Sequence, residues 1–329
     1  MNTIPALSQR LNLWGQQRKP FLLLADFELE QVQTFALADL DPAELRYCFH
    51  HQTNWPFSGM QPPVPLQWDA SFIPPATYQA AFATVQTGLQ RGDSFLTNLT
   101  FPTAIHTNWS LADIYEQTRS RYKLWWKDHF VIFSPEIFVQ IRGGKIFSNP
   151  MKGTAPGYLP ASSLLADAKE QAEHATIVDL IRNDLSQVAK GVQVDQYRYL
   201  EKLTTHQGSL WQTSSLISGQ LPVNFHTQLG DILLRLLPAG SISGAPKPET
   251  LRIIREAEGQ KRGFYTGIAA LWDGYELDSC VLIRFLEQTD EGLRYWSGGG
   301  ITAYSKWQEE YTELKEKVYL PIEAVVGVV

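Results

Sequence analysis

Strand-like runs that return on themselves through tight glycine turns constrain the fold of this chain more than any other sequence feature. The clearest is HFVIFSPEIFVQIRGGKIF, in which apolar residues continue up to Gly143 and Gly144 and resume after them. Glycine adopts the left-handed backbone of tight turns without a steric penalty, so this stretch predicts a β-hairpin. Hairpins of this kind build antiparallel sheets.

Helical patterns stand between the strand-like runs. The stretch TYQAAFATVQTGLQRG spaces its apolar residues at helical intervals and ends at Gly92. KEQAEHATIVDLIRNDLSQVAKG predicts a long amphipathic helix that stops at Gly191, and WQEEYTELKEKVYL predicts a last helix. Helices and hairpins mixed in this order indicate the α+β class, with antiparallel sheets rather than a doubly wound parallel sheet.

The first 75 residues differ from the rest of the chain. They contain one strand-like run, PFLLLADFE, and lead into a proline-rich stretch, NWPFSGMQPPVPLQW. Such a density of proline is typical of a connector. We therefore predict a short N-terminal segment over residues 1–75 and a main domain over residues 76–329.

Composition excludes several classes of protein. Apolar residues make up 44% of the 329 residues and aromatic residues 12%, so the chain can bury a substantial core. The formal net charge of −6 argues against a nucleic-acid-binding surface. An anionic small molecule remains possible as a ligand, because a site needs only local positive charge.

The cysteines and the N-terminus bear on location. Cys48 and Cys280 both lie in apolar runs, where a free thiol behaves as a small hydrophobic group, which indicates a reducing compartment. MNTIPALSQRLNLWGQQ lacks the apolar core of a signal peptide, and no stretch approaches the roughly 18 apolar residues of a membrane span. We expect a cytoplasmic protein that engages no membrane.

Two of the predicted helices carry an E-x-x-E pair: Glu170 with Glu173, and Glu310 with Glu313. Side chains three residues apart share one helix face. If the two faces met, they would form the oxygen-rich kind of site that Mg²⁺ takes. The alternative for each pair is an exposed helix face covered by solvent.

Two glycine-containing stretches could bind an anion through backbone N–H groups. YWSGGGI places glycines directly after a strand, where a glycine-rich hairpin turn is the alternative. GSISGAPKPET opens a helix after a Gly/Ser turn, where an ordinary loop and cap is the alternative.

Three charged side chains stand at unusual places. Arg284 ends the apolar run SCVLIR and could clamp a carboxylate or simply reach solvent. Glu136 interrupts a strand-like run and could act as an acid or lie at a strand edge. Lys152 stands in NPMKGTAPG, whose prolines and glycines predict a sharp, constrained turn.

Together these elements resemble the chorismate-utilising enzyme family. The resemblance extends from about residue 78 to residue 324, and it rests on EHATIVDLIRNDL, PAGSISGAPK, DSCVLIR, GGGI and the E-x-x-E-x-x-x-K pattern that ends at Lys317, in the order of the family. It implies the family's α+β fold, with antiparallel sheets packed together and helices on the outside.

The resemblance also implies a site. Mg²⁺ would be held chiefly by Glu173 and Glu313, with Glu170 and Glu310 in support through water. Other positions match those that hold the carboxylates of chorismate in the family. These are Arg284, Lys317, Ser241, Ser243 and the backbone of Gly298, Gly299 and Gly300.

The stretch PMKGT separates members of the family. It is similar to the P-I-K-G-T of aminodeoxychorismate synthases, whereas anthranilate synthases carry alanine in place of the lysine. The resemblance implies that Lys152 is a nucleophile that adds at C2 while the C4 hydroxyl leaves, protonated by Glu136. Isochorismate and salicylate synthases use a lysine base where this chain has Leu96. A leucine cannot activate water, which disfavours those two activities.

The expected activity is therefore Mg²⁺-dependent amination of chorismate with ammonia to 4-amino-4-deoxychorismate, towards 4-aminobenzoate and folate. The resemblance implies that a separate glutamine amidotransferase subunit supplies the ammonia. The alternatives are anthranilate synthase component I and a non-catalytic homologue that binds chorismate.

Some positions depart from the family. Gln212 replaces a frequent histidine and Leu271 a common tyrosine, which bears on the geometry of the pocket. The segment 1–75 resembles a reduced remnant of the N-terminal lobe that binds tryptophan in longer members, and no tryptophan site is expected.

Overall fold

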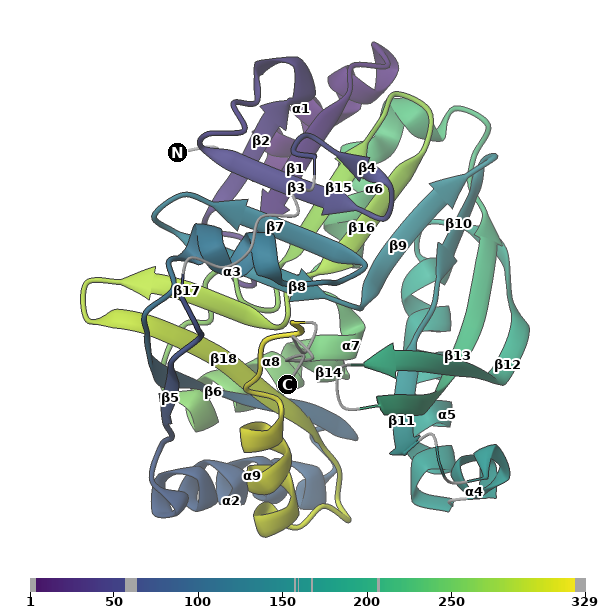
Figure 1. Ribbon diagram of the computed structural model, residues 1–329. Coiled ribbons are helices and arrows are strands. Elements are labelled where there is room, and N and C mark those ends of the chain that lie inside the picture. The colour runs from purple at the N-terminus through teal and green to yellow at the C-terminus, as the bar shows by residue number, and fades with distance from the viewer. Residues whose placement is uncertain are drawn as a thin grey trace. The chain divides into compact units, whose positions relative to one another are not determined.

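The computed structural model describes residues 4–56, 64–156, 158, 160–166, 168–205 and 208–322 (Figure 1). The chain divides into two compact units that alternate along the sequence. The first unit comprises Met1–Asp39, Glu136–Ser241 and Arg262–Val281. The second comprises Leu40–Pro135, Ile242–Lys261 and Leu282–Val329. None of the helices in these described residues combines the length and the apolar character needed to cross a membrane.

The first unit is built on a nine-stranded antiparallel sheet with the order β11-β13-β10-β9-β16-β15-β1-β2, in which β12 also pairs with β13. Its strands are β1 (Phe21–Ala25), β2 (Val32–Ala36), β9 (Ile137–Arg142), β10 (Lys145–Ser148), β11 (Met151–Pro156), β12 (Lys190–Thr205), β13 (Gly208–Gln220), β15 (Ile268–Trp272) and β16 (Leu277–Val281).

The predicted hairpin at the two glycines is confirmed. Gly143 and Gly144 have φ values of 56° and 76°, and they connect β9 to β10. The register pairs Lys145 with Arg142 and Ile146 with Ile141 directly across the turn. The turn therefore uses the backbone region that glycine enters at least cost.

The helices of the first unit are α1 (Ile4–Gln16), α4 (Ala161–Ala166), α5 (Ala168–Ser186) and α6 (Leu229–Leu236), together with the 3₁₀ turns η1 (Leu37–Asp39) and η2 (Phe225–Gln228). Helix α5 packs on β11, β12 and β13. The helix is present as predicted, but the predicted stop at Gly191 is wrong. The helix already ends at Ser186, and Gly191, with a φ of 60°, lies in β12.

The second unit has its own nine-stranded antiparallel sheet with the order β14-β6-β18-β17-β8-β7-β3-β4, in which β5 also pairs with β6. Its strands are β3 (Leu45–Phe49), β4 (Gln52–Thr53), β5 (Trp68–Ser71), β6 (Leu96–Thr107), β7 (Tyr122–Trp126), β8 (Phe130–Ser134), β14 (Gly244–Ala245), β17 (Phe285–Thr289) and β18 (Gly292–Ile301). With two antiparallel sheets and their helices, the predicted α+β class is confirmed.

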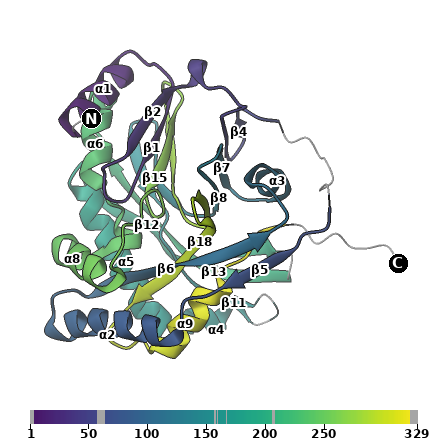
Figure 2. The ribbon, with the colours of Figure 1, turned by 90° about the vertical axis from the view of Figure 1, so that its left-hand side faces the viewer.

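The helices of the second unit are α2 (Pro75–Arg91), α3 (Leu111–Gln117), α8 (Lys247–Glu258) and α9 (Trp307–Glu316). The short helix α7 (Gly240–Ser243) spans the boundary between the two units in the sequence. Figure 2 shows α2, α8 and α9 near β6 and β18, against which they pack. The predicted end of α2 at Gly92 is confirmed, because Gly92 closes the helix with a φ of 81°.

The N-terminal segment is richer than the sequence indicated. In addition to the expected strand β1, the described part of residues 1–75 contains α1 and the strands β2 to β5. Residues 1–39 belong to the first unit and residues 40–75 to the second, so this segment contributes to both sheets. That it is a remnant of a larger lobe stays a prediction.

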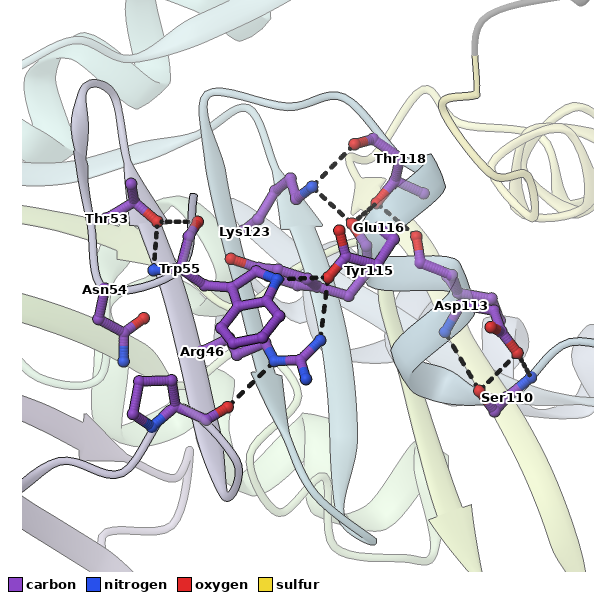
Figure 3. A network of polar contacts seen from close by, with 12 residues as sticks. Arg46, Thr53, Asn54, Trp55, Ser110, Asp113, Tyr115, Glu116, Thr118 and Lys123 are labelled. Carbon is purple, nitrogen blue, oxygen red and sulfur yellow. Dashed lines mark hydrogen bonds and ion pairs between the residues drawn. The ribbon is translucent and has the colours of Figure 1, made fainter. Parts of the chain in front are cut away.

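A polar network joins β3 to α3 in the second unit (Figure 3). The guanidinium of Arg46 lies 3.9 Å from the ring centroid of Trp55 and 4.6 Å from that of Trp125. Arg46 also donates a hydrogen bond to Glu116 Oε1 at 2.9 Å, and the Trp55 indole donates to the same oxygen at 2.6 Å. Each charge in this network is therefore paired, as a half-buried ion pair requires.

Lys123 of β7 ends in the same network (Figure 3) and is only 8% exposed. Its ammonium group donates to the carbonyl oxygen of Tyr115, in the last turn of α3, at 2.5 Å and to that of Thr118, which follows the helix, at 2.9 Å. Burial lowers the pKa of Lys123 to about 8. The side chain thus caps a helix end, where a cation opposes the negative end of the helix dipole.

Candidate functional site

The predicted acid Glu136 lies in the first unit, immediately before β9. Ser241 Oγ donates a hydrogen bond to Glu136 Oε1 at 2.5 Å, and both residues are half-buried. The backbone of Glu136 is fixed as well, because its carbonyl accepts a hydrogen bond from Val281 N at 3.2 Å. The resemblance placed Ser241 on a substrate carboxylate, but here its hydroxyl contacts the side chain of Glu136.

A close contact at Gly240 holds Ser241 relative to helix α5. A Cβ atom built on Gly240 would lie 2.7 Å from Asp184 Oδ2 and 3.0 Å from Leu180 Cγ, and both of these residues belong to α5. Only glycine allows α7 to begin so close to the helix. Through Ser241, the position of the Glu136 carboxyl group is linked to that of α5.

Helix α5 carries the first predicted pair of metal ligands. Glu170 and Glu173 are both half-buried, and their spacing puts them on one face of the helix. The neighbouring His174 is fully buried, and its Nε2 lies 2.7 Å from Ser215 Oγ on β13. His174 therefore fixes the rotation of α5 on the sheet. The adjacent residues Glu173 and His174 in the sequence could have indicated this role, but a function was predicted only for Glu173.

Lys152 lies in strand β11, so the predicted turn over NPMKGTAPG is wrong for residues 151–156. The backbone of Lys152 pairs with Thr213 of β13, and the register shifts between Lys152 and Thr154. Strand β13 is long enough to pair with β10 and then with β11, so residues after Pro150 continue the sheet instead of leaving it. The side chain of Lys152 lies outside the described residues.

Helix α9 carries the second predicted pair, in the second unit. Glu310 is 6% exposed, and Glu313 forms an ion pair with Lys317 in which Oε1 and Nζ are 2.5 Å apart. Lys317 Nζ also donates to the carbonyl oxygen of Gly298 at 2.9 Å. The structure thus brings Glu310 and Glu313 of α9, and Lys317 directly after it, together with the glycine run of β18.

The glycine run lies inside strand β18, so the alternative of a hairpin turn is wrong for this stretch. Gly298, Gly299 and Gly300 pair with Thr100, Leu99 and Asn98 of β6. A Cβ atom on Gly298 would lie 2.2 Å from the carbonyl oxygen of Leu99, so a side chain there would push β6 away.

Gly299 faces the carboxylates of α9. A Cβ atom on Gly299 would lie 3.2 Å from Glu313 Oε1 and 3.6 Å from Glu310 Oε2. The missing side chain therefore leaves space over both carboxylates. Oxygen donors of this kind are the ligands that Mg²⁺ prefers, and the pair fits such an ion.

Arg284 lies between β16 and β17 with a φ of 52°, in the left-handed region that non-glycine residues rarely occupy. Its guanidinium carbon is 5.4 Å from the ring centroid of Tyr319, and its Nε donates to Tyr319 Oη at 3.4 Å. A strained backbone of this kind persists only where the surrounding structure holds it. Ser243, the last residue of α7, is fully buried.

Three further positions mark departures from relatives. Leu96, which the resemblance matches to the lysine base of isochorismate and salicylate synthases, is 4% exposed and pairs with Ala245. Leu271 is buried in β15, and Gln212 of β13 pairs with Thr154 of β11. Leu96 therefore presents an aliphatic, water-excluding side chain at the start of β6.

The predicted residues thus fall into two groups, one in each unit. The first group comprises Glu136, Lys152, Glu170, Glu173 and Ser241, and the second comprises Ser243, Arg284, Gly298, Gly299, Gly300, Glu310, Glu313 and Lys317. Within the residues that the structure describes, no three His, Cys, Asp or Glu side chains gather as metal ligands would. The binding of Mg²⁺ stays a prediction.

Comparison with known proteins identifies relatives across the whole chain. A family described as chorismate binding enzyme matches residues 21–323. An uncharacterised PabA-like protein of Haemophilus influenzae is 49% identical over 98% of this chain and 98% of its own length. An uncharacterised PabA-like protein of Pasteurella multocida is 48% identical over 97% of this chain and 99% of its own.

A solved structure of a related enzyme has a similar fold. The crystal structure of anthranilate synthase component I from Streptococcus pneumoniae is 27% identical, with a TM-score of 0.67. The match covers 79% of this chain and 61% of that one, so this chain spans about three fifths of the length of the solved relative.

Proposed function

This chain belongs to the family of chorismate binding enzymes, and we propose that it aminates chorismate with ammonia to give 4-amino-4-deoxychorismate. The observation that carries the proposal is the packing of β11, which contains Lys152, against α5, which contains Glu170 and Glu173. Together with Glu136 and Ser241, these residues supply one compact unit with a lysine, an acid and a carboxylate pair.

The proposed reaction begins with the amine of Lys152. In its neutral form the amine forms a bond to C2 of the ring, the double bond shifts, and the C4–O bond breaks. Glu136 gives its proton to the departing hydroxyl, which leaves as water. Ammonia then forms a bond to C4, the double bond shifts back, and the C2–N bond to Lys152 breaks. Lys152 leaves as its neutral amine, and the new ammonium group at C4 returns one proton to Glu136. Both residues are thus regenerated, and the net change replaces hydroxyl by amine.

The hydrogen bond from Ser241 supports the role of Glu136. It holds one carboxyl oxygen of Glu136 in place at 2.5 Å. A catalytic acid contributes most when its position is fixed before the substrate arrives.

Chorismate is a dianion, so the site must supply positive charge and hydrogen-bond donors. We assign carboxylate binding to Arg284, Lys317, Ser243 and the backbone of the glycine run, and Mg²⁺ binding to Glu173 and Glu313 with support from Glu170 and Glu310. When bound, Mg²⁺ would supply positive charge to a substrate carboxylate. The contact of Arg284 with the Tyr319 ring suits this role, because the ring limits the freedom of the guanidinium.

The proposal includes a partner. Ammonia would come from a separate glutamine amidotransferase subunit, and free ammonia at high concentration would replace it in the test tube.

Anthranilate synthase component I is the second candidate. The solved relative from Streptococcus pneumoniae carries that name, and the two activities share chorismate and ammonia as substrates. Lys152 favours the first candidate, because the resemblance assigns alanine to anthranilate synthases at this position.

Product analysis decides between them. The purified protein is incubated with chorismate, Mg²⁺ and an excess of ammonium salt. The products are then separated by chromatography and identified by mass spectrometry. We expect 4-amino-4-deoxychorismate, which an added lyase converts to 4-aminobenzoate. Anthranilate would support the second candidate, and the absence of any turnover would indicate a protein that only binds chorismate.

A further inference from the structure

Tyr78, in the first turn of α2, has a buried hydroxyl that no described residue of the protein satisfies. The side chain is 0% exposed, and its Oη has no hydrogen-bond partner. Leaving such a group unpaired in an interior costs about 1–3 kcal/mol. An unsatisfied buried group in a well-packed region therefore indicates a bound water, an ion or a role in function.

The surroundings of Tyr78 are well packed. Its ring lies 5.3 Å from that of Tyr311 and 6.0 Å from that of Phe101, measured between centroids. It belongs to an apolar cluster that includes Leu99 and Leu314. Loose packing does not explain the missing partner.

The neighbouring tyrosine provides a contrast. Tyr311 belongs to the same cluster, and its hydroxyl donates to the carbonyl oxygen of Ile73 at 2.7 Å. Of these two neighbouring tyrosines, Tyr311 has a hydrogen-bond partner among the described residues and Tyr78 has none.

The acidic residues of α9 lie beside this cluster. Tyr311 directly follows Glu310 in the helix, and Leu99 pairs with Gly299, over which the oxygens of Glu310 and Glu313 lie. Burial raises the pKa of the Tyr78 phenol, and the charges of Glu310 and Glu313 raise it further. The phenol therefore keeps its proton and is a hydrogen-bond donor near two carboxylates.

We propose that Tyr78 is a positioning residue for these carboxylates: its hydroxyl donates a hydrogen bond, through one ordered water, to Glu310. A water that bridges a buried donor and a charged acceptor is nearly as favourable as a direct hydrogen bond. The bridge holds Glu310, and with it Glu313 one turn later, in the orientation that binds a cation. This inference rests on the Mg²⁺ site of the proposed function.

The test is titration of Mg²⁺ into the full-length protein by isothermal calorimetry, with thermal unfolding in the absence of metal as a second measurement. The variant is Tyr78→Phe, which removes only the hydroxyl. The matched control is Tyr122→Phe, because Tyr122 is equally buried and its hydroxyl pairs with His50 Nε2 at 3.1 Å.

Without metal, we expect Tyr78→Phe to unfold slightly below the wild-type temperature, because it loses one water-mediated hydrogen bond, and Tyr122→Phe to unfold at a lower temperature as well. With metal, we expect Tyr78→Phe to bind Mg²⁺ about tenfold more weakly, equivalent to ~1.4 kcal/mol. Tyr122→Phe should keep the wild-type affinity. Because Tyr122→Phe also loses a buried hydrogen bond but keeps its Mg²⁺ affinity, a merely structural role of Tyr78 would not produce this pattern.

Wild-type affinity in Tyr78→Phe would overturn the inference and leave the proposed function untouched. If the wild-type protein itself bound no Mg²⁺, both the inference and the metal assignment would fail, while product analysis would still test the amination.

Discussion

Ser241 and Glu136, the last and first residues of the central segment of the first unit, are joined by a hydrogen bond of 2.5 Å. This hydrogen bond joins the two ends of the segment Glu136–Ser241 at the proposed catalytic acid. Ser241 therefore acts on the chemistry through Glu136 in our interpretation, whereas the family resemblance assigns it to the substrate.

Ser241→Ala distinguishes these roles. Glu136 acts as a protonated, neutral acid, and a hydrogen bond between neutral groups contributes about 0.5–1.5 kcal/mol. We therefore expect kcat to fall up to about tenfold with little change in KM. Ser241→Thr keeps a hydroxyl and should retain more activity than the alanine variant. A raised KM with unchanged kcat would instead place Ser241 on a carboxylate of chorismate.

Lys152→Arg tests the covalent step. Arginine keeps the positive charge but cannot act as an amine nucleophile, so we expect chorismate to bind while product forms orders of magnitude more slowly. Wild-type protein incubated with chorismate and no ammonia should show an adduct on the peptide that contains Lys152. Lys145→Arg, at an exposed position of β10, is the control. Near-normal amination by Lys152→Arg would mean that the residue only binds the substrate.

Glu313→Gln removes one of the proposed Mg²⁺ ligands together with its ion pair to Lys317. The Glu313 side chain is 48% exposed, so the melting temperature should change little. We expect Mg²⁺-dependent activity and calorimetric Mg²⁺ binding to fall more than tenfold. Glu309→Gln removes an exposed carboxylate that pairs with Lys306 on the same helix and should leave both unchanged. Wild-type activity of Glu313→Gln at limiting Mg²⁺ would refute the assignment.

The two glycines of β18 should respond differently to alanine. Gly298→Ala places a Cβ atom against the backbone of Leu99, which cannot move without shifting β6, so we expect a loss of about 1–3 kcal/mol in unfolding free energy. Gly299→Ala meets only the flexible ends of Glu310 and Glu313, so it should fold normally and bind Mg²⁺ more weakly. Chemical denaturation and metal titration measure the two effects. Equal stability of the two variants would contradict this expectation.

The pH dependence of stability should report on Lys123. Burial lowers its pKa to about 8 in the folded protein, compared with 10.5 for an ordinary lysine. Between these values the unfolded chain binds more protons than the folded one, so the unfolding free energy rises with pH. We expect wild type to gain up to about 3 kcal/mol relative to Lys123→Met between pH 8 and pH 10.5. Parallel stability curves for the two proteins would show that Lys123 does not titrate in this range.

Local sequence signals predicted the elements whose ends depend on local backbone conformation. Gly92 ends α2, and Gly143 with Gly144 turns the hairpin, because each adopts a positive φ that few other residues adopt. The carboxylate pair of α9 was also found correctly on a helix, because three-residue spacing needs no knowledge of the rest of the chain.

The errors concern partners that are distant in the sequence. The sequence of residues 151–156 and of the run Gly298–Gly300 is typical of turns. In the structure, however, residues 151–156 pair with β13 and the glycine run pairs with β6, so both segments form strands. The contacts of Ser241 and Tyr78 likewise depend on tertiary packing. No spacing in the sequence reveals that one hydroxyl meets Glu136 while the other has no partner in the described residues.

The pairing of β1 with β15 affects how the protein must be made. Leu23 of β1 lies opposite Ala270, so the inner edge of β1 remains open on the ribosome until most of the chain has been synthesised. All five residues of this strand, FLLLA, are buried in the finished sheet. An apolar strand with an open edge is prone to pair with other chains. We therefore expect slow translation between these two strands to increase aggregation of the nascent protein.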